Sequence, residues 1–135
     1  MNKLHLLLSL ATFLFFSCQK QASPPYSIFW FQGEAATSEA LYPVNIGEYN
    51  ETIIESGFQS GSPEYFLQLN DMTPHPIEDS SFIMESHGWD GEKSQYFETV
   101  HLGLSFDSTE YSKGDVLTVI SRHSGFKEEL QLVIL

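Results

Sequence analysis

The feature that most constrains the fold of this chain is a clean alternation of apolar and polar residues in its last third. Side chains of a β-strand point to opposite faces in turn, so a period of two predicts a strand with one buried and one wet face. The chain must then supply a second apolar layer to cover the buried side. Within 95–106 the expected inward residues are Val100, Leu102, Leu104 and Phe106, and the expected outward residues are Thr99, His101, Gly103 and Ser105.

Further short strands are predicted by β-branched and aromatic runs separated by turn-forming residues. The first is 26–31, whose continuous apolar run favours burial on both faces and places Trp30 in the core. The most secure hairpin closes the chain, with strands at 116–121 and 126–135 around an Arg-His-Ser-Gly turn. The other expected strands are 41–46, 51–55, 65–69 and 81–85.

Three local expectations follow from proline and glycine. Pro43 has no N–H to donate, so it restricts the strand at 41–46 to a sheet edge. The sequence Gly-Glu-Tyr-Asn after it predicts a turn and hence a hairpin between 41–46 and 51–55. Residues 86–94 are rich in turn formers and predict a loop with Trp89 at its tip.

The fold class expected from this pattern is all-β. About seven to nine short strands are predicted, and no helical pattern follows residue 18, which is typical of an antiparallel sandwich or barrel. Near the end, Lys113-Gly114-Asp115 leads into a β-branched strand and a terminal hairpin. This ending resembles the last strands of immunoglobulin-like modules in bacterial surface lipoproteins. The resemblance implies one antiparallel immunoglobulin-like β-sandwich over 26–135.

The N-terminus has the pattern of an export signal. Lys3 gives a positive start, residues 4–16 are mostly apolar, and the small Ser17 precedes Cys18. The apolar run is shorter than the roughly 20 residues that a membrane-spanning helix needs. Ser17-Cys18 resembles the lipobox of bacterial lipoproteins, and Phe15 in place of the usual leucine is tolerated in Bacteroidota-like members. The alternative is an ordinary secretory signal that happens to contain a cysteine.

The lipobox resemblance divides the chain into three parts. It implies a signal peptide at 1–17, a lipidated Cys18 that begins a flexible tether through residue 25, and the sandwich domain after it. Attached acyl chains would hold the protein to the membrane. In that family an aspartate directly after the cysteine favours inner-membrane retention in enterobacteria. Gln19 at this position therefore implies the outer membrane of a bacterial cell envelope.

The chain is strongly acidic. It has 18 acidic and six basic residues, and cleavage before Cys18 would remove Lys3, leaving five basic residues and a formal charge of −13. Nucleic acid is excluded as a partner, because phosphate binding needs a basic surface. The acidity is typical of a solvated surface, and it also favours the capture of a basic partner. With Cys18 lipidated no disulfide can form, so stability must come from a core rich in aromatic residues.

No sequence motif indicates catalysis or a cofactor. There is no Gly-x-Ser-x-Gly turn and no phosphate-binding glycine loop, and the one cysteine, Cys18, is either part of the leader or lipidated. Asp90-Gly91-Glu92 and Asp71 resemble fragments of a calcium loop, but the EF-hand spacing is missing. Four histidines remain after cleavage, and none has zinc-ligand spacing: His75, His87, His101 and His123. We therefore expect no enzyme, no metal site and no cofactor.

Trp89 and Asp90 are the candidate partner-contact residues. An exposed tryptophan can stack on a sugar or anchor a partner protein, whereas the alternative is that Trp89 covers one end of the core. The expected function is a non-enzymatic binding or accessory module of the envelope, with a basic protein or a glycan as partner. The alternatives are an inhibitor of a basic enzyme such as lysozyme, and a small carbohydrate-active hydrolase.

Overall fold

The computed structural model describes residues 23–135, so the predicted leader, Cys18 and the first residues of the predicted tether lie outside it. The described residues form ten strands and one turn of 3₁₀-helix, η1 (Asp79–Ser81). None of their helices is long and apolar enough to cross a membrane. The strands are β1 (Tyr26–Phe31), β2 (Glu34–Ala35), β3 (Leu41–Val44), β4 (Tyr49–Phe58), β5 (Glu64–Leu69), β6 (His75–Pro76), β7 (Phe82–Asp90), β8 (Gln95–Ser105), β9 (Val116–His123) and β10 (Phe126–Ile134).

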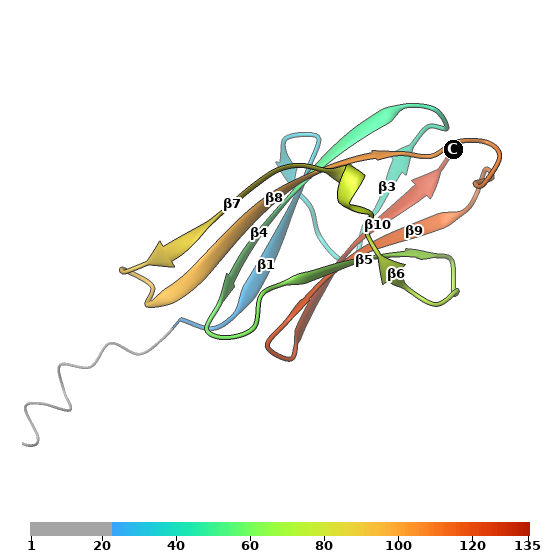
Figure 1. Cartoon of the computed structure of the whole chain (residues 1–135). Coiled ribbons are helices and arrows are strands. Elements are labelled where there is room, and N and C mark those ends of the chain that lie inside the picture. The colour runs from blue at the N-terminus through green and yellow to red at the C-terminus, as the bar shows by residue number, and fades with distance from the viewer. Residues whose placement is uncertain (1–22) are drawn as a thin grey trace, which may run out of the picture.

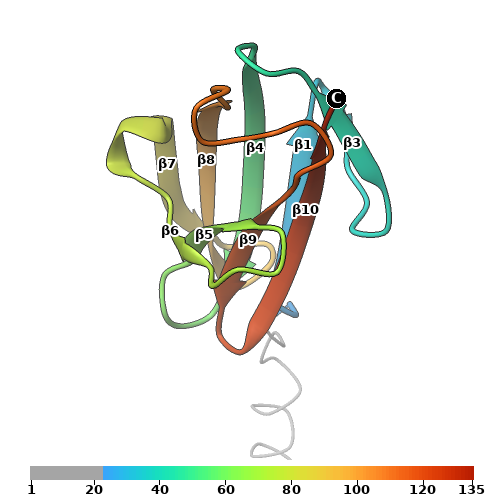
Figure 2. The same cartoon turned by 90° about the vertical axis from the view of Figure 1, so that its right-hand side faces the viewer.

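The strands build two sheets that pack face to face (Figures 1 and 2). Their orders are β2-β1-β4-β8-β7 and β3-β10-β9-β5-β6. Immunoglobulin domains place strands A, B, E and D in one sheet and strands C, F and G in the other. Here β1, β4, β8 and β7 take the first four places, and β5, β9 and β10 take the other three. The predicted all-β, immunoglobulin-like sandwich is confirmed.

The pairing differs from the prediction in three ways. The described residues form ten strands and not seven to nine, because β2 and β6 are two-residue strands too short to predict. β3 pairs in parallel with β10, so the fold is not purely antiparallel. The predicted hairpin between 41–46 and 51–55 is wrong, since β3 and β4 belong to different sheets. The segment between β3 and β4 crosses from one sheet to the other, and within it the N–H of Gly47 donates to the carbonyl of Phe106. The edge position expected from Pro43 is confirmed.

The alternation at 95–106 defines the core as predicted. Its four apolar residues are buried between the sheets, opposite the inward residues of β9 and β10. The terminal hairpin is also confirmed: Ser124 and Gly125 both have positive φ, as a tight two-residue hairpin turn requires. The core cluster comprises Phe29, Phe31, Val44, Ile54, Tyr65, Ile77, Val100, Leu102, Leu104, Phe106, Leu117, Val119, Leu130, Leu132 and Ile134.

Two predictions about tryptophans are wrong. Phe29 and Phe31 point inward, so Trp30 lies between them on the outer face of β1 and is only half-buried. The described part of the chain forms no second layer over that face. A continuous apolar run does not reveal which of its two faces is covered. Trp89 lies within β7, because the expected loop at 86–94 is a strand up to Asp90. Gly88 lies within this strand, and a Cβ at its position would be 2.9 Å from the ring of Phe97 on β8, so a larger residue there would clash with that ring.

The described chain enters the sandwich beside the β7–β8 turn. The N–H of Ser23 donates to the carbonyl of Lys93 at 3.1 Å. The side-chain amide of Gln95, at the start of β8, donates to the carbonyls of Ser23 and Pro24 at 3.4 and 3.3 Å. The C-terminus lies at the opposite end of the sandwich (Figure 1). The last residues of the predicted tether are therefore bonded to the domain.

Candidate functional site

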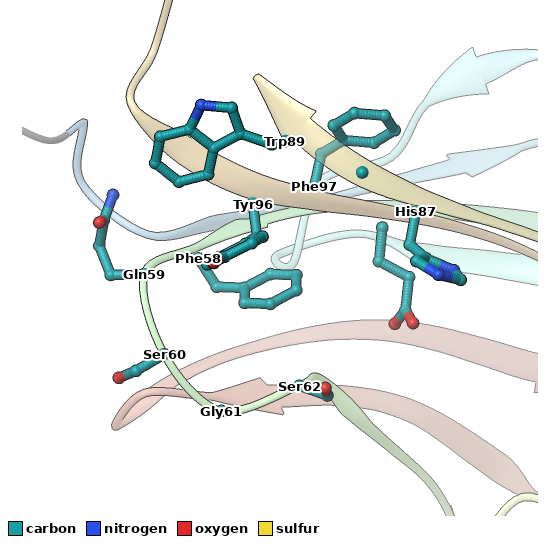
Figure 3. Close-up of a pocket in the computed structure, with 11 residues that line it drawn as sticks. Phe58, Gln59, Ser60, Gly61, Ser62, His87, Trp89, Tyr96 and Phe97 are labelled. Atoms are coloured by element: carbon teal, nitrogen blue, oxygen red, sulfur yellow. The ribbon is translucent and has the colours of Figure 1, made fainter. Parts of the chain in front are cut away.

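A groove opens at the end of the sandwich where the chain enters. It runs between the β7–β8 hairpin and the β4–β5 loop and has a volume of about 520 Å³. Figure 3 shows Trp89, Tyr96 and His87 on the hairpin, and the Gln59–Ser62 loop across from them. The groove forms because this part of the hairpin extends past the second sheet, which leaves inward-facing side chains uncovered. The lining residues are Phe58, Gln59, Ser60, Gly61, Ser62, His87, Gly88, Trp89, Tyr96, Phe97 and Glu98.

Three aromatic rings form one wall of the groove. Trp89 and Tyr96 are directly opposite each other in the β7–β8 ladder, so their side chains share a face. Their ring centroids are 4.9 Å apart in an edge-on arrangement, and the two residues remain 55% and 48% exposed. Tyr96 also stacks on the buried ring of Phe58 at 5.9 Å. Contact with a buried ring holds the two exposed rings in place as a preformed apolar surface.

A carboxylate is held beside these rings. Tyr65, on β5 of the other sheet, donates its hydroxyl hydrogen bond to Glu98 Oε2 at 2.6 Å. Burial, and next the hydrogen bond to Glu98, raise the pKa of Tyr65 above its ordinary value, so the phenol stays protonated and remains a donor. Glu98 is half-buried and lines the groove. The site therefore combines aromatic surface with an oriented acidic group.

No basic side chain neutralises this carboxylate within residues 23–135. The two ion pairs formed there join His101 to Glu51 and Lys127 to Glu129. Lys93, in the nearby turn, instead lies over the ring of Tyr26 at 5.2 Å from the centroid. Aromatic faces and carboxylates both attract cations, so the groove is chemically suited to a lysine or arginine side chain.

The two candidate contact residues have different positions. Trp89 is exposed and lines the groove, so it does not simply cover the core, although its contact with a partner stays a prediction. Asp90 does not line the groove, and its Oδ1 accepts the N–H groups of Glu92 and Lys93 at 3.0 and 3.2 Å, which organises the turn. The sequence analysis missed Phe58, Tyr96 and Glu98. One signal in the sequence could have indicated two of them: Tyr96 and Glu98 continue the inward-facing positions of β8 towards the start of the strand.

The described residues hold no metal-binding cluster: within 23–135 no group of three His, Cys, Asp or Glu side chains converges. His101 lies on the outer face and contacts Glu51, while His123 is buried, so these two histidines do not meet. Glycoside hydrolysis generally uses two carboxyl groups. Glu98 is the one carboxylate among the groove-lining residues, so the groove does not supply such a pair.

A serine–histidine cluster crosses the core behind the groove. Ser27 Oγ lies 2.9 Å from both Ser56 Oγ and Ser121 Oγ, and 3.1 Å from His123 Nε2. The distance resembles that between a nucleophile and its base, but Nε2 donates its hydrogen to the carbonyl of Tyr26 and so cannot accept one from Ser27. All four residues are also buried, and within residues 23–135 no acid contacts the imidazole. In antibody domains a disulfide joins the strands equivalent to β4 and β9. Here Ser56 of β4 and Ser121 of β9 are connected through Ser27 of β1, so the role of the cluster is structural.

His123 is held in its neutral form. Burial lowers the pKa of His123. Its Nε2 donates to the carbonyl of Tyr26 at 3.1 Å, and its Nδ1 is buried with no hydrogen-bond partner among the described residues. A proton added to Nδ1 would therefore bury a charge without an acceptor.

We expect His123 to make the domain less stable in mild acid. The pKa of His123 is lower in the folded state than in the unfolded state, where it is about 6.5. The free energy of unfolding is therefore undiminished above about pH 6.5 and decreases as the pH falls below that value. Urea unfolding at pH 7.5 and 5.5 should show a loss of stability in the native chain that is reduced in His123→Gln. Asp107 and Asp115 also have lowered pKa values, but they titrate in stronger acid. Equal pH dependence in the two proteins would contradict the assignment.

Comparison with protein-family models and with curated proteins finds no match for this chain. The fold and the groove are therefore the basis for any statement about function.

Proposed function

We propose that this chain is a lipid-anchored, non-enzymatic binding module of the bacterial envelope that captures a basic partner in its groove. The observation that supports the proposal most strongly is Glu98: a half-buried carboxylate that accepts a hydrogen bond from a neutral phenol, has no basic partner among residues 23–135, and lies beside exposed aromatic rings. A buried or half-buried charge is costly to leave unpaired. A cationic side chain of a partner would supply the missing charge, and the rings of Trp89 and Tyr96 would pack along its aliphatic part.

The net charge supports the same partner class. With 18 acidic residues against five basic ones after cleavage, the domain would attract a basic protein over a long range. A basic enzyme such as lysozyme belongs to this class, so the inhibitor hypothesis is a special case of the proposal. The short-range contacts of the groove would then select among basic partners.

The proposed anchor would be close to the groove, because the first described residues lie at the groove end of the sandwich. Four residues lie between Cys18 and Ser23, which bonds to the β7–β8 turn, so an extended tether of five Cα-to-Cα steps would span at most about 18 Å. A lipid on Cys18 would therefore hold the groove near the membrane surface. The space of up to about 18 Å between the membrane surface and the domain would be wide enough for a peptide strand or a loop of a partner, because one packed sheet layer takes about 10 Å.

A glycan is the second candidate partner. Trp89 and Tyr96 expose ring faces next to polar side chains of the facing loop, Gln59, Ser60 and Ser62. Sugars stack on such rings and bond to such polar groups. The two candidates differ in charge dependence, because capture of a neutral glycan does not depend on the acidity of the domain.

Photo-crosslinking in intact cells tests the proposal. A photoreactive amino acid at position 89 should capture a basic protein, whereas the same amino acid at position 49 should not. Tyr49 is a matched control, being an aromatic residue on the same sheet that is 63% exposed and lies outside the groove. Capture of carbohydrate at position 89 would favour the glycan candidate. The same products from both positions would contradict a role for the groove.

A further inference from the structure

The edge strand next to the groove is unusually long. Among the described strands, four lie at sheet edges: β2 and β6 have two residues, β3 has four, and β7 has nine. An edge strand exposes backbone N–H and C=O groups that can pair with another chain. β7 is therefore the main backbone surface at which the described part of the chain can bind another strand.

Most of β7 is regular enough for pairing. Its register with β8 is interrupted by a bulge between Phe82 and Met84 and then runs without a break from Glu85 to Asp90. These six residues span about 20 Å. They include no proline or lysine, which are common devices for protecting an edge.

Alternate side chains of this segment lie on the same face of the sheet as the groove, and two of them, His87 and Trp89, line it. Glu85, His87 and Trp89 pair with Val100, Glu98 and Tyr96, and paired residues share a face of the sheet. A strand added beside β7 would continue this face and bring every second side chain over the groove. Backbone pairing and the groove would then contact one and the same ligand.

The charges around the segment favour a basic ligand. Residues 82–98 contain four acidic residues and one basic residue, Lys93, which lies over Tyr26. Glu85 is close enough to Tyr65 to contribute, with Glu98, to raising the pKa of that phenol. Carboxylates thus stand on both β7 and β8 along the face that an added strand would cover.

We propose that β7 accepts an extended basic peptide segment as an additional strand of its sheet. The backbone of the segment pairs with Glu85–Asp90, and its alternate lysine or arginine side chains enter the groove towards Glu98 and the aromatic rings. This inference rests on the proposed function and adds the conformation and chemistry of the bound segment. Strand addition supplies affinity through the backbone, and the groove supplies selectivity through side chains.

Peptide probes test strand addition on the full chain in a neutral detergent. The first probe is a ten-residue peptide of alternating lysine and valine, the second carries N-methyl groups on its six central residues, and the third has glutamate in place of lysine. N-methylation removes backbone donors and leaves the charge unchanged. The lysine peptide should bind about tenfold or more tightly than either of the other two. Hydrogen exchange in 85–90 should slow when it binds.

The outcomes separate the inference from the proposed function. Equal affinity for the first two probes would overturn strand addition, while a groove that captures basic side chains would remain. A lysine peptide that does not bind would also overturn strand addition, and the crosslinking at positions 89 and 49 would then decide the proposed function. Binding of the lysine peptide without slower exchange in 85–90 would place the peptide elsewhere and overturn the inference.

Discussion

Leu102→Ala is expected to lower the free energy of unfolding by about 2–5 kcal/mol. Leu102 is fully buried at the middle of β8, where it lies between Thr52 of β4 and Phe82 of β7 in the sheet. Removal of its side chain leaves a cavity that neighbours on both sheets cannot easily fill. Urea unfolding of the native and variant proteins measures the difference directly.

Thr99→Val is the matched control for this substitution. Thr99 lies on the same strand but on its outer face, and valine keeps the branched shape. Its free energy of unfolding should stay within about 0.5 kcal/mol of the native value, as is typical of surface sites. A similar loss in both variants would show that the two faces of β8 are not distinct. A negligible change in the free energy of unfolding of Leu102→Ala would show that the inward face of β8 is not part of the core.

Cys18→Ala is expected to abolish lipid attachment completely. In the proposed lipoprotein, the sulfur of Cys18 carries the acyl groups, and no other cysteine is present to replace it. Cells given labelled palmitate should incorporate label into the native protein and none into the variant. The variant should also accumulate as an uncleaved precursor that retains residues 1–17, which mass spectrometry detects.

Ser17→Ala separates this effect from a general failure of export. Alanine keeps a small residue before the cysteine, so the label should remain. Palmitate incorporation into Cys18→Ala, or its absence from the native protein, would refute the anchor. The groove and its partner would then belong to a protein released from the membrane.

The sandwich could be predicted from local pattern, but the pairing of its first strands could not. The alternation around Leu102 reports directly which face is covered, because every inward position meets the second sheet. The turn after Pro43 looked like a hairpin, yet β3 pairs with β10 some 90 positions later in the chain. Such a pairing depends on the whole topology, which no local pattern encodes.

The groove could not be predicted for the same reason. Trp89 was singled out by its residue type and its surroundings in the sequence, and its exposure agrees with that choice. Glu98 is held in the groove by a hydrogen bond from Tyr65, which is 33 positions away in the sequence and on the other sheet. The serine cluster likewise joins Ser27 to Ser121, 94 positions apart. Contacts between distant polar residues define the site, and hydrophobic periodicity does not detect them.

The central claim, capture of a basic partner by an acidic domain with an aromatic groove, is tested most directly by binding kinetics. Surface plasmon resonance should be run at several salt concentrations, with the partner protein that the photoreactive amino acid at position 89 captures. We expect association to slow as salt rises, and Glu92→Gln to lower the association rate and flatten this dependence. Trp89→Ala should mainly speed dissociation and leave the salt dependence unchanged, while Tyr49→Ala should change neither. Binding that is indifferent both to salt and to Trp89→Ala would contradict the claim.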